Sequence, residues 1–264
     1  MRIGFITDEI SPDFEEAIRL GVSWGIRDFE LRTLHGKRVP QISGGEIHQL
    51  MRLQKEHGLR FTALSPGVFK GTLHELARLE HELQEVLPQT YQLARLFCTP
   101  IIIGFGFKRA TSDTPSDQKR VVEALSRAAA SAQQHGLTLA VENEPGFWCD
   151  TGTNAARILA QINAPNIRAN WDPANAFGLN EEPYPFGYEA LKPWIANVHV
   201  KDTSKGALAE CVPLGEGKVD WQAQLQALVR DQLVAHVTLE THCAPLAENS
   251  KRNLEYLRGI LDPR

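Results

Sequence analysis

The sequence is short of cysteine, of long apolar runs and of charge gathered in blocks. Its four cysteines stand far apart among 264 residues, and none forms a Cys-x-x-Cys pair. This spacing indicates reduced thiols rather than a disulfide framework or a thiolate-rich zinc site. The longest apolar stretch, 101–107, contains two glycines and is far shorter than the ~18 residues that span a bilayer. We therefore expect no membrane partner.

Charge and the start of the chain exclude further classes. The formal net charge is -4, and the chain has no basic stripe to neutralise the phosphates of a nucleic acid. It opens directly on a strand-like run, Met1–Ile6, without the charged region and apolar core of a secretory signal. These features predict a cytoplasmic protein without a nucleic-acid partner.

Strand-like and helix-like segments alternate along the whole chain. Apolar residues recur at helical spacing in 14–22 and in 121–132, which is typical of helices that pack on a core. Short apolar runs between the helices read as buried parallel strands. The strands are expected near 2–8, 26–31, 59–64, 99–105, 137–142, 166–172, 195–200 and 234–240.

The ends of several helices carry their own signals. Ser11-Pro12 predicts an N-cap followed by proline at the first helical position. Ser43–Glu46 and Thr72–Glu75 have the spacing of capping boxes that open the next two helices. Gly58 and Gly136 are placed for left-handed C-caps directly before a strand.

Eight β/α units leave two architectures, a closed barrel and a doubly wound open sheet. The open sheet usually has a glycine-rich turn after its first strand. Here that turn is Asp8–Pro12, which contains no glycine. No linker interrupts the series, and about 250 residues is typical of a barrel. The sequence therefore predicts an α/β protein with a (β/α)8 TIM barrel as a single domain, 1–264.

Four side chains suited to metal binding stand at the ends of the last four expected strands. They are Glu142, Asp172, His199 and Glu240, at the strand ends that carry the chemistry of such barrels. Each taken alone has a structural explanation, as a partner of an arginine or as a helix cap. Together they would be a costly cluster of like charge without a cation. Their oxygen-rich donors favour one divalent ion, Mn²⁺ before Mg²⁺ or Co²⁺, with zinc as an alternative.

At these residues the sequence resembles a known group, the sugar isomerase/epimerase-like barrels related to xylose isomerase and endonuclease IV. The resemblance covers essentially the whole chain, with its most specific motifs after residue 137. The matching motifs are Leu139–Asn143, Asn170–Asn175, Val198–Asp202, Pro213–Gly217 with Val219–Trp221, and Leu239–His242.

The resemblance implies a TIM barrel whose divalent metal is held by Glu142, Asp172, His199 and Glu240. It also implies that Glu142 and Glu240 are catalytic and move a proton. A metal that chelates adjacent carbonyl and hydroxyl oxygens of a carbohydrate-like substrate stabilises an enediolate as it forms. Two carboxylates on opposite faces of the substrate then remove the proton and return it.

The substrate-binding residues depart from the pattern of ketose 3-epimerases in this group. Where those enzymes have a second Glu, a His and an Arg, this chain has Trp148, Asn175 and Lys205. The resemblance therefore implies a similar metal site with a different substrate, and these three positions are expected to contact it.

Three further side chains follow a ligand candidate by two residues and so point the same way on the strand. Lys201 is expected to bind substrate or to pair with Glu216 or Asp202. Glu144 and His242 are expected either to touch substrate or a ligand, or to face solvent.

Arg32, at the end of the second expected strand, lies on the same face. It is expected to pair with Glu30 or Asp8 rather than to orient an anionic group.

These features favour a metal-dependent isomerase or epimerase acting beside a carbonyl. The alternative is a dehydratase of an inosose- or dehydroshikimate-type substrate, which needs an acid such as Lys201 or His242 to protonate the leaving hydroxyl. A phosphodiester-cleaving endonuclease and a non-catalytic metal-binding barrel are less favoured. Oligomers are common in the group, and we expect a homodimer.

Overall fold

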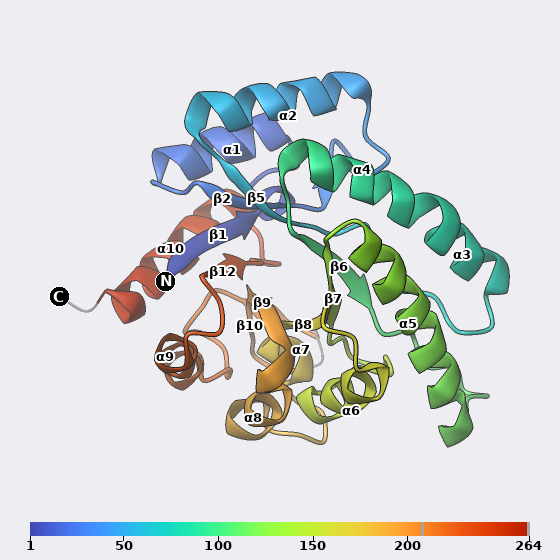
Figure 1. The fold of residues 1–264 in the computed structure, drawn as a ribbon. Coiled ribbons are helices and arrows are strands. Elements are labelled where there is room, and N and C mark those ends of the chain that lie inside the picture. Colours follow the sequence, from blue (N-terminus) through green and yellow to red (C-terminus); the bar gives the residue numbers. More distant parts are fainter. Residues whose placement is uncertain (207–208, 263–264) are drawn as a thin grey trace.

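The computed structural model describes residues 1–206 and 209–262, which form one closed barrel of eight parallel strands (Figure 1). Around the barrel the strands follow the order of the chain, and β12 closes on β1. They are β1 (Arg2–Ile6), β2 (Asp28–Leu31), β5 (Arg60–Leu64), β6 (Ile101–Phe105), β7 (Thr138–Glu142), β8 (Ile167–Trp171), β9 (Ile195–Val200) and β12 (His236–Leu239). All eight lie within two residues of their expected ends, so the predicted TIM barrel is confirmed.

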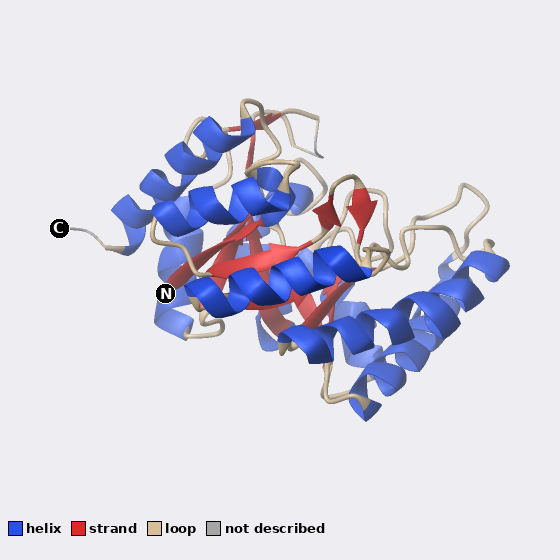
Figure 2. Ribbon diagram, turned by 90° about the horizontal axis from the view of Figure 1, so that it is seen from above, coloured by secondary structure: helices blue, strands red, loops and turns tan. Residues whose placement is uncertain are grey.

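Helices surround the strands, as Figure 2 shows in blue around red. They are α1 (Phe14–Ser23), α2 (Gly44–His57), α3 (Leu76–His81), α4 (Leu87–Phe97), α5 (Gln118–Gln134), α6 (Gly152–Ile162), α7 (Pro173–Ala176), α8 (Tyr188–Leu191), α9 (Trp221–Asp231) and α10 (Leu246–Leu261). Short 3-10 turns lie at Thr7–Glu9, Pro115–Asp117 and Lys192–Trp194, and π turns at Glu82–Val86 and Pro183–Gly187. Among the described residues, none of these helices is long and apolar enough to cross a membrane.

Two helix starts differ from the sequence prediction. α1 begins at Phe14, because the Asp13 carboxylate accepts the free N–H groups of the first turn while Ser11-Pro12 stays outside the helix. Thr72–Glu75 forms a turn closed by the Thr72 N–H and the Glu75 carboxylate, and α3 begins only after it. The capping box at Ser43 and the left-handed Gly58 and Gly136 are confirmed.

The side chains inside the barrel change from apolar to polar along its axis. Ala63, Ile101, Ile103 and Ala140 form a small apolar cluster inside it. Toward the carboxyl ends of the strands the buried side chains become polar, and Asn170 is an example. A larger apolar cluster lies between the strands and the helices. The helices and the outer core therefore hold the barrel together, which leaves the inner layer at one rim free for polar chemistry.

Two small hairpins extend from the strand ends. β3 (Thr33–Leu34) pairs with β4 (Lys37–Arg38), and β10 (Asp202–Thr203) pairs with β11 (Cys211–Val212). Each follows a barrel strand, β2 or β9, so both hairpins stand at the rim that carries the polar layer.

Candidate active site

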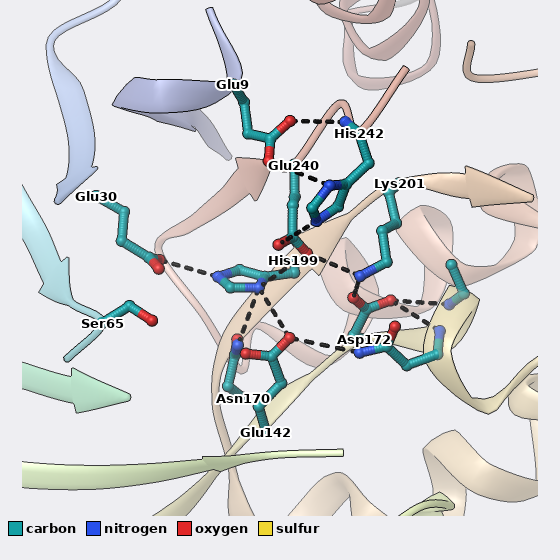
Figure 3. A network of polar contacts seen from close by, with 12 residues as sticks. Glu9, Glu30, Ser65, Glu142, Asn170, Asp172, His199, Lys201, Glu240 and His242 are labelled. Atoms are coloured by element: carbon teal, nitrogen blue, oxygen red, sulfur yellow. Dashed lines mark hydrogen bonds and ion pairs between the residues drawn. The ribbon is translucent and has the colours of Figure 1, made fainter. Parts of the chain in front are cut away.

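Four buried side chains, Glu142, Asp172, His199 and Glu240, converge at this rim. Each offers a potential ligand atom, and the four atoms lie within 4.8 Å of one another. His199 Nδ1 lies 3.4 Å from Glu142 Oε1 and 3.4 Å from Glu240 Oε2. Figure 3 shows the two glutamates on either side of the imidazole ring. The structure thus brings together the four residues that the sequence predicted to meet.

Parallel strand pairing explains the convergence. β7 ends at Glu142, which pairs with Asn170 near the end of β8, and Asp172 directly follows that strand. His199 lies near the end of β9, and Glu240 directly follows β12. Because the strands are parallel and adjacent, their carboxyl ends meet at one height in the barrel.

The donor set suits a divalent cation. Ligand atoms about 2.0–2.3 Å from one ion lie roughly 3–3.5 Å from each other. The separations of 3.4 Å around His199 Nδ1 match that spacing. Three carboxylates and one imidazole are also the donors that hard divalent cations prefer. The cluster can therefore bind a metal ion.

The His199 ring is held by a carboxylate on its far side. Glu30 Oε2 lies 3.0 Å from His199 Nε2, and Glu30 is fully buried, so Nδ1 faces the other members of the cluster. Burial alone would lower the pKa of His199, but the carboxylates of Glu30, Glu142 and Glu240 raise it well above its ordinary value. The histidine must lose its proton to ligate a cation.

Lys201 lies against two members of the cluster. Its Nζ is 2.6 Å from Asp172 Oδ2 and 2.9 Å from Glu240 Oε2, and its side chain is 2% exposed. The expected ion pair with Glu216 or Asp202 is therefore wrong. Alternation along the strand sends the Lys201 side chain inward and that of Asp202 the other way, where its carboxylate accepts backbone N–H groups.

Arg32, which follows β2, forms ion pairs with acidic residues that follow β1 and β12. Its guanidinium pairs with Asp8 at 2.9 Å and with Glu240 at 2.7 Å, and it also contacts Glu9. The pairing with Asp8 is as predicted, whereas Glu30 pairs with the histidine instead of Arg32. Glu9, Glu240 and a neighbouring histidine form a second group with metal-binding spacing. Arg32 already supplies the compensating positive charge there.

A cavity of about 360 Å³ opens on the cluster. Four of the six predicted substrate residues line it. They are Glu144, Asn175, Lys201 and His242. Asn175 Nδ2 lies 3.4 Å from Glu142 Oε1, and His242 Nε2 lies 2.9 Å from Glu240 Oε1.

Trp148 and Lys205 do not line this cavity, contrary to the sequence prediction. Trp148 is buried and faces a separate hollow. The Arg109 guanidinium covers it, with Arg109 Cζ 4.5 Å from the centre of the Trp148 ring. Lys205 is 69% exposed and pairs with Glu210 at 2.9 Å on the β10–β11 hairpin. Both positions lie in rim loops, where spacing from a strand does not fix the direction of a side chain.

The family profile for xylose isomerase-like TIM barrels matches residues 18–260. The chain belongs to this family. It is 24% identical over 238 residues to the 3-dehydroshikimate dehydratase of Bacillus anthracis, covering 83% of this chain and 82% of that protein. It is 25% identical over 203 residues to the 2-epi-5-epi-valiolone 7-phosphate 2-epimerase of an Actinoplanes strain, covering 76% of this chain and 72% of that enzyme.

Solved structures show the same fold. The IolI protein with a bound zinc atom superposes with a TM-score of 0.83 at 17% identity, covering 99% of this chain and 98% of that one. Relatives of this xylose isomerase-like barrel are thus enzymes of more than one reaction class.

Several residues at the site were not identified as functional from the sequence. Glu9 and Arg38 lie on short segments after the first two barrel strands, and Lys70 follows β5. Phe105, at the end of β6, forms an apolar wall of the cavity. For Glu30 a signal existed, because it is a charged residue in a short strand whose four residues are all buried. The others carry no local pattern, since their role depends on contacts across the barrel.

Proposed function

We propose that this protein is a divalent-metal-dependent isomerase or epimerase of a polyhydroxylated, carbohydrate-like carbonyl compound. The observation that carries the proposal is the placement of Glu142 and Glu240 on either side of the His199 ring (Figure 3), each 3.4 Å from its Nδ1. Paired carboxylates at one reacting centre suit removal of a proton from one side and its return on the other.

The metal would be held by Glu142, Asp172, His199 and Glu240. When bound, it would polarise a substrate carbonyl and so make the adjacent C–H group acidic. Zinc bound to the IolI protein supports a metal in this fold. We favour Mn²⁺ for this chain because its donors are mostly hard oxygens, with Mg²⁺, Co²⁺ and Zn²⁺ as alternatives.

The two glutamates have unequal surroundings, which suggests unequal roles. Besides His199, which both glutamates contact, Glu240 is contacted by three cationic or potentially cationic groups, Arg32, Lys201 and His242. Glu142 receives a long contact from an asparagine amide, and within ion-pair distance it faces, among the described residues, only the His199 imidazole. We therefore assign proton removal to Glu142 and proton return to Glu240, beside the groups that can resupply a proton.

The lining of the cavity suits a molecule with many hydroxyl groups. Asn175, Glu144 and Lys201 present an amide, a carboxylate and an ammonium group to it. Phe105 offers one apolar surface against which a ring or carbon chain can pack. Such a lining can orient a small polar substrate by hydrogen bonds.

A dehydratase is the second candidate, and two observations favour it. One relative is a 3-dehydroshikimate dehydratase. In addition, the His242 side chain is 40% exposed at the cavity and contacts Glu240, where it can protonate a leaving hydroxyl. Burial alone would lower the pKa of His242, but the carboxylates of Glu240 and Glu9 raise it, which favours the acid form.

Proton exchange with solvent tests the proposed function. The metal-loaded protein is incubated in D₂O with ketoses, inososes and dehydroshikimate-like acids, and the products are analysed by mass spectrometry. Isomerisation or epimerisation places deuterium beside the carbonyl without other change in formula, whereas dehydration removes the α-proton and the β-hydroxyl as water and lowers the mass by one water molecule. Glu142→Gln and Glu240→Gln should each lower exchange by about 10²–10⁴-fold.

Metal content is measured in every variant, because both glutamates are also proposed ligands. Glu56→Gln on the exposed surface is the matched control and should exchange like the wild type. Full exchange in both glutamate variants with metal retained would refute the paired-carboxylate mechanism. Absence of exchange with every compound would instead favour a binding role.

A further inference from the structure

Arg38, on the short strand β4, is a cation of the cavity wall without an acidic partner. Among residues 1–206 and 209–262, its guanidinium forms no ion pair with a carboxylate. Arg32 lines the same cavity but is bound by Asp8, Glu9 and Glu240. The two arginines therefore differ: one is occupied within the protein, and the other is available to a ligand.

The Arg38 guanidinium is nevertheless held in a fixed orientation. Its Nε donates to the Ser65 carbonyl oxygen at 2.9 Å, and one Nη donates to Ser65 Oγ at 3.1 Å. The group packs on Gly67, where a Cβ would lie 2.7 Å from Arg38 Nε. Gly67 also has φ +77°, a conformation that favours glycine. One edge of the guanidinium is thus fixed by backbone and hydroxyl groups that leave its charge uncompensated.

The electrostatic surroundings agree with this geometry. Burial, and then the nearby positive charge of Arg32, lower the pKa of Arg38, and the more distant carboxylates offset this only in part. A half-buried positive charge without a paired anion is unfavourable unless a ligand neutralises it. Its planar array of donors also matches the oxygens of a carboxylate or phosphate.

A second cation stands close to the same place. Lys70 lines the catalytic cavity together with Arg38, and the two residues also line an adjoining hollow of about 380 Å³. Lys70 Nζ lies 3.1 Å from Glu144 and 4.0 Å from the centre of the Phe105 ring. The two cations therefore mark the junction of the two hollows, where part of a substrate can extend away from the reacting centre.

We propose that the substrate carries an anionic group, a carboxylate or a phosphate, that binds Arg38 with Lys70 beside it. The inference rests on the proposed function, since it specifies the substrate class of the same site. It makes Arg38 a residue that selects charged over neutral polyhydroxylated compounds.

Binding of matched pairs tests this selection. Isothermal titration of the metal-loaded protein compares quinate with methyl quinate, and D-fructose 6-phosphate with D-fructose, so each pair differs in an anionic group. In the wild type at least one charged member should bind about ten- to a hundredfold more tightly than its neutral partner. Preference in the first pair identifies a carboxylate site, and preference in the second a phosphate site.

Arg38→Gln should abolish the preference, and Arg38→Lys should retain part of it. Arg127→Gln removes an exposed positive charge from α5 on the outside of the barrel and is the matched control, with an unchanged preference. Circular dichroism and metal content establish that the variants are folded and loaded. Equal or absent binding of the charged and neutral members to the wild type overturns the proposal, as does a preference that survives in Arg38→Gln.

The solvent-exchange experiment separates this proposal from the proposed function. A charge preference that depends on Arg38 in a protein that exchanges no proton would support the anion site and refute the isomerase. Exchange confined to neutral compounds would support the isomerase and refute the anion site.

Discussion

Glu30 is a buried acid that acts on the site through another residue. Its carboxylate fixes the His199 ring from the side opposite the cluster. Carboxylate partners of this kind orient a histidine ligand and increase its basicity. Glu30→Gln should therefore weaken metal affinity by about 10–100-fold, measured by competition with a chelating dye.

Glu144→Gln is the control for that prediction. Glu144 is in the same cavity but pairs with Lys70 and has no contact with His199. Its variant should bind the metal like the wild type. Equal affinity of the Glu30 and Glu144 variants would show that Glu30 does not position the histidine.

His236 predicts a pH dependence of stability at the opposite end of the barrel. Burial, partly offset by Asp28, lowers its pKa to about 4, with Arg2 and Arg60 acting in the same direction as burial. The unfolded chain then binds a proton between pH 6.5 and 4 that the folded protein does not. The unfolding free energy therefore keeps its full value above pH 6.5, where His236 is neutral in both states, and decreases as the pH falls through this window.

The loss attributable to His236 is about 3 kcal/mol at most. It is measured as the unfolding free energy from urea titrations between pH 7 and pH 4.5. His236→Gln should show a shallower pH dependence than the wild type, whatever its stability at pH 7. Parallel curves for the two proteins would contradict the prediction.

The loop after β11 shows how an element is held against a strand end. The Asp202 carboxylate accepts the backbone N–H groups of Gly215, Gly217 and Val219. A Cβ at Gly217 would overlap that carboxylate, so the loop needs glycine for this close approach. Gly217→Ala should lower the unfolding free energy by about 1–3 kcal/mol, measured by chemical denaturation.

Gly259→Ala provides the opposite case in the same protein. Gly259 lies in α10, and a Cβ there would meet no atom within 4 Å. Alanine should stabilise the protein by about 0.5–1 kcal/mol through helix propensity alone. If Gly217→Ala left stability unchanged or raised it as Gly259→Ala should, the account of Gly217 would fail.

Across the whole molecule, the four proposed ligands come from the second half of the barrel. Glu142, Asp172, His199 and Glu240 belong to four neighbouring strands or their ends, β7, β8, β9 and β12. A cation bound only by the folded protein stabilises it by about 2.7 kcal/mol at a concentration 100 times Kd. Stripping the metal with a chelator should therefore lower Tm by roughly 5–10 °C.

Differential scanning calorimetry with and without Mn²⁺ measures that change. Asp172→Asn removes one charged ligand and should show a much smaller shift. An equal metal-dependent shift in Asp172→Asn and the wild type would exclude Asp172 as a ligand.

Assembly is the other property of the whole molecule. The homodimer expected from the family resemblance stays a prediction. Sedimentation at micromolar concentration should give a dimer, and a single monomer species would contradict it.

Local pattern determined the barrel and the position of the proposed ligands. Apolar periodicity is set by neighbouring residues, and parallel strands place their ends together, so Glu142, Asp172, His199 and Glu240 were predictable one strand at a time. Only the tertiary structure decided their partners, because the pairs join distant segments. His199 and Glu30 are 169 residues apart, and Arg32 and Glu240 are 208 apart.

The loops at the rim are a second place where the sequence did not predict which side chains line the cavity. A strand fixes the direction of its side chains by alternation, which placed Lys201 correctly toward the cavity. A loop has no such rule, so Trp148 turned into a separate hollow and Lys205 into solvent. Arg38 lies on a short hairpin whose position depends on Ser65 and Gly67 in the loop after the next barrel strand. Its place at the cavity follows from long-range packing, which no local pattern encodes.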